Sequence, residues 1–229
     1  MDENPNTRLL AFSDGVIAVA ITLLILEIRL PEGFGEMNDA ELWAAVLALW
    51  PRFAAFLLSF AVIGVYWLNH HRKFEQIVKA DSGLRWLNLL FLLTICVVPF
   101  TTAVIAQNAG FVGTALYAGV MMMCGLSLAL IWAYAERNDM IEADLTRDER
   151  RRVLVGTLLV PAIFAISVPL SFAHPDGAKF FWLLIIPANF ALRTVMMVVW
   201  KIRHPGQPFP DRSARSQGQR REPEKATKP

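Results

Sequence analysis

The sequence predicts an all-α membrane protein with six transmembrane helices, arranged as one six-span repeat per chain. Two observations predict this class. Three long stretches contain no Asp, Glu, Lys or Arg: residues 86–106, 110–135 and 153–173. Roughly 20 apolar residues are enough for a helix to cross the hydrocarbon core of a bilayer. In addition, 55% of the 229 residues are hydrophobic, which exceeds the usual share in a soluble domain.

The other three expected spans each have a charged residue in or beside them, namely Asp14, Arg52 and Arg193. A charge within a span must face protein or water, which makes it a functional candidate. We expect the spans at about 9–29, 42–70, 85–106, 110–136, 152–173 and 179–201. Together they form one transmembrane domain over residues 1–201.

The positive charges predict the orientation. With this span count, eighteen Lys and Arg residues fall on one side of the membrane and only Arg29 and Lys179 on the other. Because loops rich in Lys and Arg stay in the cytosol, we expect both termini there and a multi-pass protein of the cytoplasmic membrane. Residues 202–229 are rich in Pro, Gly, Ser and Arg, which predicts a basic, disordered cytosolic tail near anionic lipid rather than on nucleic acid.

One cytosolic segment, residues 136–152, mixes six acidic residues with five arginines. We expect it to be a solvated extension of the flanking helices and not a catalytic carboxylate site. The sequence also lacks phosphate-binding glycine loops, HExxH and GxSxG motifs. His70 and His71 are adjacent and would point about 100° apart on a helix, so one metal ion rarely binds both. We therefore expect no enzyme, no metal and no cofactor.

The first expected span has an apolar stripe. At 100° per residue, one face carries Gly15, Val19, Thr22, Leu23 and Leu26. By itself such a stripe is typical of an ordinary helix–helix contact, in which Thr is common. Asp14 lies on the opposite side of this helix and needs polar partners. At a similar membrane depth the candidates are Arg8, His70, His71 and Asn88.

Three motifs then resemble one known family. The segment Arg8-x-x-x-Phe12-Ser13-Asp14 is similar to the signature of the transmembrane protein 175 family, which comprises potassium-permeable channels of lysosomes and prokaryotes. The segment from Trp67 to His70-His71 is similar to the Trp-x-x-His-His segment of the family. The third expected span, with Trp86, Asn88 and Pro99-Phe100, is similar as well. The resemblance covers roughly residues 8–200.

This resemblance implies a function and a set of site residues. A chain with one six-span repeat looks like a prokaryotic member, which assembles as a homotetramer in membrane lipid and conducts potassium ions passively. The first helix would line the pore. By distance from the motif aspartate, Val19, Leu23 and Leu26 would form the hydrophobic constriction or gate, and Thr22 the selectivity layer. Val19 is one carbon smaller than the Ile or Leu that is common there, so a looser seal is expected.

The resemblance also implies a structural polar network at the inner end of the pore helix. Its members are Arg8, Phe12, Ser13, Asp14, Trp67, His70, His71 and Asn88. Two alternatives to a potassium channel stay open. The first is a proton-permeable or non-selective cation leak on the same architecture. The second is a secondary transporter, for which no inverted repeat is visible but in which Pro161, Pro169 and Pro187 would permit kinked helices.

Overall fold

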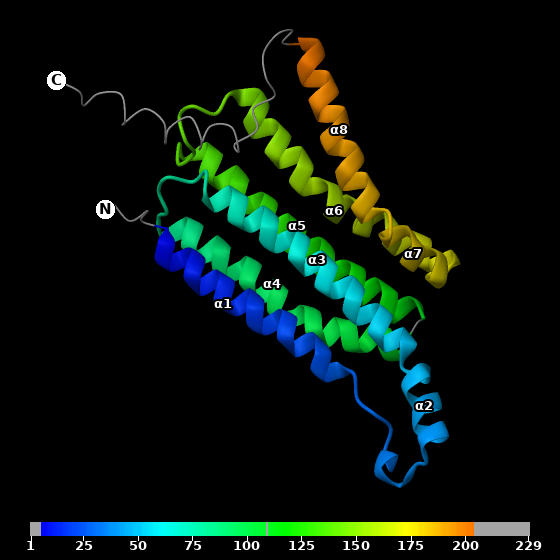
Figure 1. Cartoon of the computed structure of the whole chain (residues 1–229). Helices are drawn as coiled ribbons and strands as arrows, with labels where there is room; N and C mark the ends of the chain where they lie inside the picture. Colours follow the sequence, from blue (N-terminus) through cyan, green and yellow to red (C-terminus); the bar gives the residue numbers. More distant parts are fainter. Residues whose placement is uncertain (1–5, 109, 204–229) are drawn as a thin grey trace, which may run out of the picture. The chain divides into compact units, whose positions relative to one another are not determined.

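The structure, a computed structural model, describes residues 6–108 and 110–203. The described chain folds into helices, which Figure 1 shows in sequence order: α1 (Thr7–Leu23), α2 (Asp39–Ala48), α3 (Trp50–Phe74), α4 (Ser82–Gln107), α5 (Phe111–Arg137), α6 (Arg147–Ala173), α7 (Pro175–Trp182) and α8 (Ile185–Arg203). Two short 3₁₀ helices, η1 (Leu24–Glu27) and η2 (Phe34–Glu36), follow α1. An isolated antiparallel β-bridge joins Ile77 to Ile141.

Five helical segments are long and apolar enough to cross a membrane. They are Thr7–Glu27, Trp50–Phe74, Ser82–Gln107, Phe111–Arg137 and Arg147–Ala173. Helix α8, of 19 residues, is a further long helix. The chain is therefore an all-α, multi-pass membrane protein.

The unit that ends at Ile185 holds α1 to α7, and the described residues from Ile186 to 203 belong to a second unit. Within the first unit, α4 packs against α1, α3 and α5, and α5 packs in turn against α6. Its largest buried side chains are aromatic: Tyr66, Phe74, Phe91, Tyr117, Trp132, Phe164 and Trp182. Helices α1, α3 and α4 thus form one side of a bundle whose other side is α5 and α6 (Figure 1).

The segment expected as a single span over 42–70 is divided in two. Helix α2 ends at Ala48, and α3 begins at Trp50 with Pro51 in its first turn. Proline has no N–H group to continue the hydrogen bonds of a preceding helix, but it fits the first turn of a new one. A capping box begins α2: the Asn38 side chain accepts from the Glu41 N–H, and the Glu41 carboxylate accepts from the Asn38 N–H.

The segment expected over 179–201 is likewise divided, into α7 and α8. The N–H groups of Leu183 and Leu184 bond to the carbonyls of Phe180 and Phe181, which closes α7 with tight turns before α8 begins. Of the expected tail, residues 202 and 203 belong to α8, and residues 204–229 lie outside the described part of the chain.

The expectation for residues 136–152 is wrong for the middle of this segment. Helix α5 ends at Arg137 and α6 begins at Arg147, so residues 138–146 form a loop. Asp139 adopts a positive φ of 53°, a conformation that ends a helix. A Thr146–Glu149 capping box then begins α6. The loop pairs with the α3–α4 connection through the bridge at Ile77, so it is a docked element.

Candidate functional site: the two faces of α1

Helix α1 separates its residues into two faces. Ser13, Ile17 and Ala20 are buried against the rest of the chain, chiefly against α4 and α3. Four residues of the predicted stripe lie on the other face: Val19 is 57% exposed, and Gly15, Thr22 and Leu23 are exposed as well. The fifth, Leu26, is 61% exposed but belongs to the 3₁₀ helix η1, where the 100° period of the α-helix no longer holds. A long row of apolar residues left open by its own chain needs lipid or another protein chain to cover it.

The Thr22 hydroxyl is oriented by its own helix. Its Oγ1 donates to the carbonyl of Val19 at 2.8 Å. Because the proton is committed to the backbone, the lone pairs of this oxygen remain available to a ligand on the exposed side. Thr22 can therefore act there as a neutral oxygen ligand, without a fixed charge.

A groove runs along the stripe, between α1 and α4, and three stripe residues line it. It is almost entirely apolar, and its lining residues are Ala11, Phe12, Gly15, Val16, Val19, Ala20, Leu23 and Cys96. A second groove, between α1 and α3, contains Asp14 and Trp67 among apolar residues. Both flanks of α1 are thus open in the single chain.

Three predicted network residues meet in the buried layer between α1, α3 and α4. The Asn88 side chain donates from Nδ2 to Ser13 Oγ at 2.9 Å, and its Oδ1 lies 2.8 Å from His70 Nε2. Since an amide oxygen only accepts, His70 carries its proton on Nε2. Ser13 Oγ donates onward to the Leu9 carbonyl at 2.8 Å. The chain of donors runs in one direction, from His70 to the backbone of α1.

The His70 ring is packed between aromatic side chains. It is fully buried and stacks on Phe91 at a centroid distance of 5.1 Å, and the Phe74 ring lies 4.5 Å away. Its Nδ1 atom has no hydrogen-bond partner. The neutral ring with a proton on Nε2 suits this pocket, because a second N–H would be buried without an acceptor.

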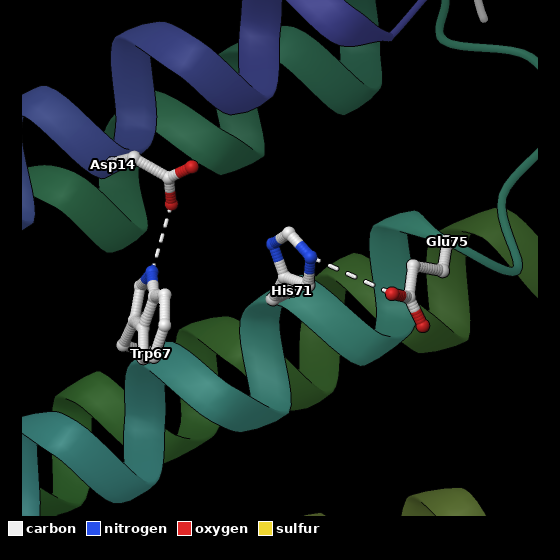
Figure 2. A network of polar contacts seen from close by, with 4 residues as sticks. All are labelled: Asp14, Trp67, His71 and Glu75. Atoms are coloured by element: carbon white, nitrogen blue, oxygen red, sulfur yellow. Dashed lines mark hydrogen bonds and ion pairs between the residues drawn. The ribbon is translucent and has the colours of Figure 1, made fainter. Parts of the chain in front are cut away.

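The partner of Asp14 differs from the four candidates named from the sequence. Its Oδ1 accepts a hydrogen bond of 2.8 Å from the indole nitrogen of Trp67, as Figure 2 shows. On the same face of α3, one turn further along, His71 pairs with Glu75 at 3.5 Å. The bond between Trp67 and Asp14 links α3 to α1, whereas the pair of His71 and Glu75 joins the last turn of α3 to the residue that follows it (Figure 2).

Two of the predicted network residues lie outside these contacts. Arg8 is exposed in the first turn of α1, and Phe12, 54% exposed, lines the groove beside α4. The structure therefore brings together Ser13, His70 and Asn88 as one set and Asp14 and Trp67 as another. His71 belongs to neither set, because its ion-pair partner is Glu75. No group of three or more His, Cys, Asp or Glu within 6–108 and 110–203 is placed to hold a metal ion.

Sequence reasoning missed contacts beyond both ends of the first span. Two residues after η1, the Arg29 carbonyl accepts a hydrogen bond of 3.0 Å from Arg52 Nη1. At the other end, the fully buried Asn6 donates from Nδ2 to the Ile77 carbonyl at 2.6 Å. The charge of Arg52 near the start of a span could have indicated that this side chain needs a polar partner. Asn6 looks like an ordinary residue before a helix, so its sequence position gave no indication of a distant contact.

The fold and the site define a multi-pass helical membrane protein with an apolar, hydroxyl-bearing helix face left open along one span. Residues 8–99 match the family described as "Endosomal/lysosomal potassium channel TMEM175". A potassium channel of Streptomyces collinus is 38% identical over 183 residues, which cover 74% of this chain and 87% of that protein. The chain belongs to the transmembrane protein 175 (TMEM175) family.

A solved structure and a vertebrate relative extend this comparison. The crystal structure of a lysosomal potassium-selective channel TMEM175 homolog from Chamaesiphon minutus is similar with a TM-score of 0.72 and 33% identity, and the match covers 83% of this chain and 98% of that one. The zebrafish "Endosomal/lysosomal proton channel TMEM175" is 28% identical over 178 residues, which cover 77% of this chain and 34% of that protein. The family is one of ion channels, so the chain is not an enzyme.

Proposed function

We propose that the chain is a potassium channel that conducts potassium ions passively across the cell membrane. Membership of the TMEM175 family supports this proposal, since the Streptomyces relative is named a potassium channel and the Chamaesiphon structure a potassium-selective one. The multi-pass helical fold supplies the membrane-crossing architecture that such a function requires.

We propose further that four copies assemble around a pore lined by α1. The observation that carries this step is the open stripe on α1, because its own chain covers the opposite face with α3 and α4 and leaves the stripe exposed. One chain has no enclosed channel along this stripe, whereas a ring of copies would enclose one. The tetramer and the identity of the pore helix rest on this argument and on the family resemblance.

Within this pore, Val19, Leu23 and Leu26 would form successive apolar rings. An aliphatic ring narrows a pore and favours its dewetting, which can close it to ions. Thr22 lies between them with its hydroxyl proton bonded to its own backbone, so four Thr22 oxygens would face the permeant ion. Neutral oxygens suit potassium because it gives up water more readily than sodium and needs no fixed charge to bind.

The orientation follows from the positive charges of the loops. We propose that both termini face the cytosol, which puts the Ser13–His70–Asn88 layer near the cytosolic side and Arg29 and Arg52 near the external side. This orientation treats α8 as the core of a sixth span. The basic residues after 203 would then lie beside the anionic inner leaflet.

Potassium flux into liposomes tests this function, with sodium as the parallel ion. We expect the wild-type protein to favour potassium, Thr22→Ala to lose that preference, and Thr22→Ser to keep it because it keeps the hydroxyl. Flux that is insensitive to Thr22→Ala would remove Thr22 from the selectivity layer. Absence of any cation flux from a folded oligomer would contradict the channel itself.

A second candidate is proton permeation through the same pore. The observation in its favour is the name of the zebrafish relative, a proton channel. A pH-sensitive dye inside the same liposomes separates the two: acidification driven by a proton gradient, with no potassium flux, would favour the proton channel.

A further inference from the structure

Asn6 occupies the N-cap position of α1 but does not cap this helix. An Asn at this position ordinarily accepts a hydrogen bond from an N–H of the first turn, which stabilises a helix by about 1 kcal/mol. Here no side-chain cap bond is formed. The side chain is fully buried and donates instead to the carbonyl of Ile77, 71 residues away, at 2.6 Å. The beginning of α1 is therefore tied to the α3–α4 connection.

The α3–α4 connection is itself held by the loop between α5 and α6. Ile77 and Ile141 form the antiparallel bridge. On either side of it, the Val78 N–H donates to the Met140 carbonyl at 2.8 Å, and the Glu142 N–H donates to the Gln76 carbonyl at 3.0 Å. We call the two paired segments, residues 76–78 and 140–142, the clasp.

Helices α5 and α6 hold the far side of the clasp. Arg150, in the first turn of α6, donates from Nη2 to the Glu142 carbonyl at 3.3 Å and from Nε to the Leu145 carbonyl at 3.1 Å. The Trp132 indole of α5 donates to the Arg150 carbonyl at 3.2 Å. A continuous series of hydrogen bonds thus runs from α5 and α6 through the clasp to the first residue before α1.

We propose that Asn6 is a positioning residue of the channel: it ties the inner end of the pore helix to the clasp, so that the clasp sets the width of the inner mouth. The inference rests on the proposed function in that it takes α1 as the pore helix. Asn6 lies seven residues before Ser13, so its bond acts two helical turns inward of the Ser13–His70–Asn88 layer. A displacement of the α5–α6 loop would reach the pore helix through this bond.

The substitution Asn6→Asp tests the tether. Asp has the same shape and caps helices equally well, but it has no N–H to donate to Ile77. The matched control is Asn38→Asp, at the N-cap of α2, where the side chain only accepts and the exchange keeps its bond. A second variant, Val78→Pro, removes the N–H that donates to Met140 and leaves α1 untouched.

Two readouts are measured on the full-length protein. The first is the potassium flux rate, with the potassium-to-sodium ratio. The loss of one hydrogen bond of typical strength changes an equilibrium about two- to tenfold, so we expect a flux change of that order for Asn6→Asp and Val78→Pro, with an unchanged ion ratio. The double variant should match the stronger single variant, because both break the same connection.

The second readout is hydrogen exchange of residues 7–12, which does not require conduction. We expect exchange to quicken in Asn6→Asp and to stay unchanged in Asn38→Asp. Faster exchange together with absent wild-type flux would contradict the proposed function and leave the tether standing. Unchanged exchange, or unchanged flux in both Asn6→Asp and Val78→Pro from a conducting channel, would overturn the tether.

Discussion

At the scale of single residues, α1 carries two kinds of hydroxyl with different surroundings. Ser13 is buried, and its oxygen both donates to Leu9 and accepts from Asn88. Thr22 is exposed and bonds only to its own helix at Val19. A buried hydroxyl that both donates and accepts a hydrogen bond stabilises a packing interface. An exposed hydroxyl with free lone pairs is suited to bind a permeant ion.

Asn88 is the central member of the buried layer. We expect Asn88→Ala to lower the free energy of unfolding by about 1–3 kcal/mol, because it leaves the His70 Nε2–H without its acceptor and Ser13 without its donor. Asn69→Ala, at a half-exposed neighbouring position on α3, is the control and should cost far less. Thermal unfolding in detergent compares them; equal losses would show that the layer contributes no special stability.

At the scale of helices, the start of α4 depends on a charged cap. The Asp81 carboxylate accepts from the Leu84 N–H at 2.8 Å and from the Tyr134 hydroxyl at 2.9 Å. The Leu84 N–H, and after it the Tyr134 hydroxyl, lower the pKa of Asp81 below its ordinary value. The charged form is thus favoured by folding, and its contribution is present above the unfolded-state pKa and disappears as the pH falls through the folded-state pKa.

This linkage predicts a measurable acid dependence. We expect the unfolding temperature of the wild type to fall as the pH drops below about 4, the ordinary pKa of an Asp side chain. Asp81→Asn keeps the cap but cannot titrate, so the part of the slope due to Asp81 should vanish. The control is Asp144→Asn, at an exposed position of the α5–α6 loop, which should retain the wild-type slope. Identical slopes in all three proteins would contradict the assignment.

The contact between α5 and α6 depends on a glycine. A Cβ atom added at Gly125 would lie 2.6 Å from the ring of Pro161, whereas one added at Gly119 of the same helix would meet nothing within 4 Å. We therefore expect Gly125→Ala to destabilise the protein by about 1–3 kcal/mol through overpacking. Gly119→Ala should be neutral or stabilising by about 0.5–1 kcal/mol. The midpoints of unfolding compare the stability of the two variants. A Gly119→Ala protein that is less stable than Gly125→Ala would contradict this packing.

Much at the scale of elements could be predicted because it depends on local patterns. The charge-free runs placed α4, α5 and α6, since hydrophobic length alone identifies such spans. The 100° period placed the stripe on one face of α1, but whether its own chain covers that face could not be predicted, and the structure leaves it exposed. The end of α2 at Ala48 and the end of α7 at Trp182 were missed, because an apolar run gives no signal of where one helix ends and the next begins.

The polar contacts were less predictable because they join distant parts of the chain. Motif residues Ser13, His70 and Asn88 could be named as a group, but which atom bonds which depends on the register between α1, α3 and α4. The partner of Asp14 depends on the same register: the structure pairs this carboxylate with Trp67 and not with one of the candidates named from the sequence. The docked loop at 138–146 was also missed, since its backbone pairing leaves no mark on composition.

At the scale of the whole molecule, the single chain leaves one side of its first span open. The span formed by α1 and η1 buries one face and leaves open a row of residues that ends with Leu26. The same row contains the hydroxyl that we assign to selectivity. A ring of chains would turn this open face into the wall of a pore, and the groove between α1 and α3, which contains no stripe residue, would then be available to a neighbouring copy.

The most direct test asks whether this face of α1 meets water. In a Cys96→Ala background, Leu26→Cys and Val19→Cys place thiols on the stripe, and Ala20→Cys places one on the buried face. A water-soluble, positively charged thiol reagent is added to conducting liposomes. We expect potassium flux to be blocked in Leu26→Cys and Val19→Cys and unaffected in Ala20→Cys. Block at Ala20→Cys alone, or at none of the three, would contradict a pore lined by α1.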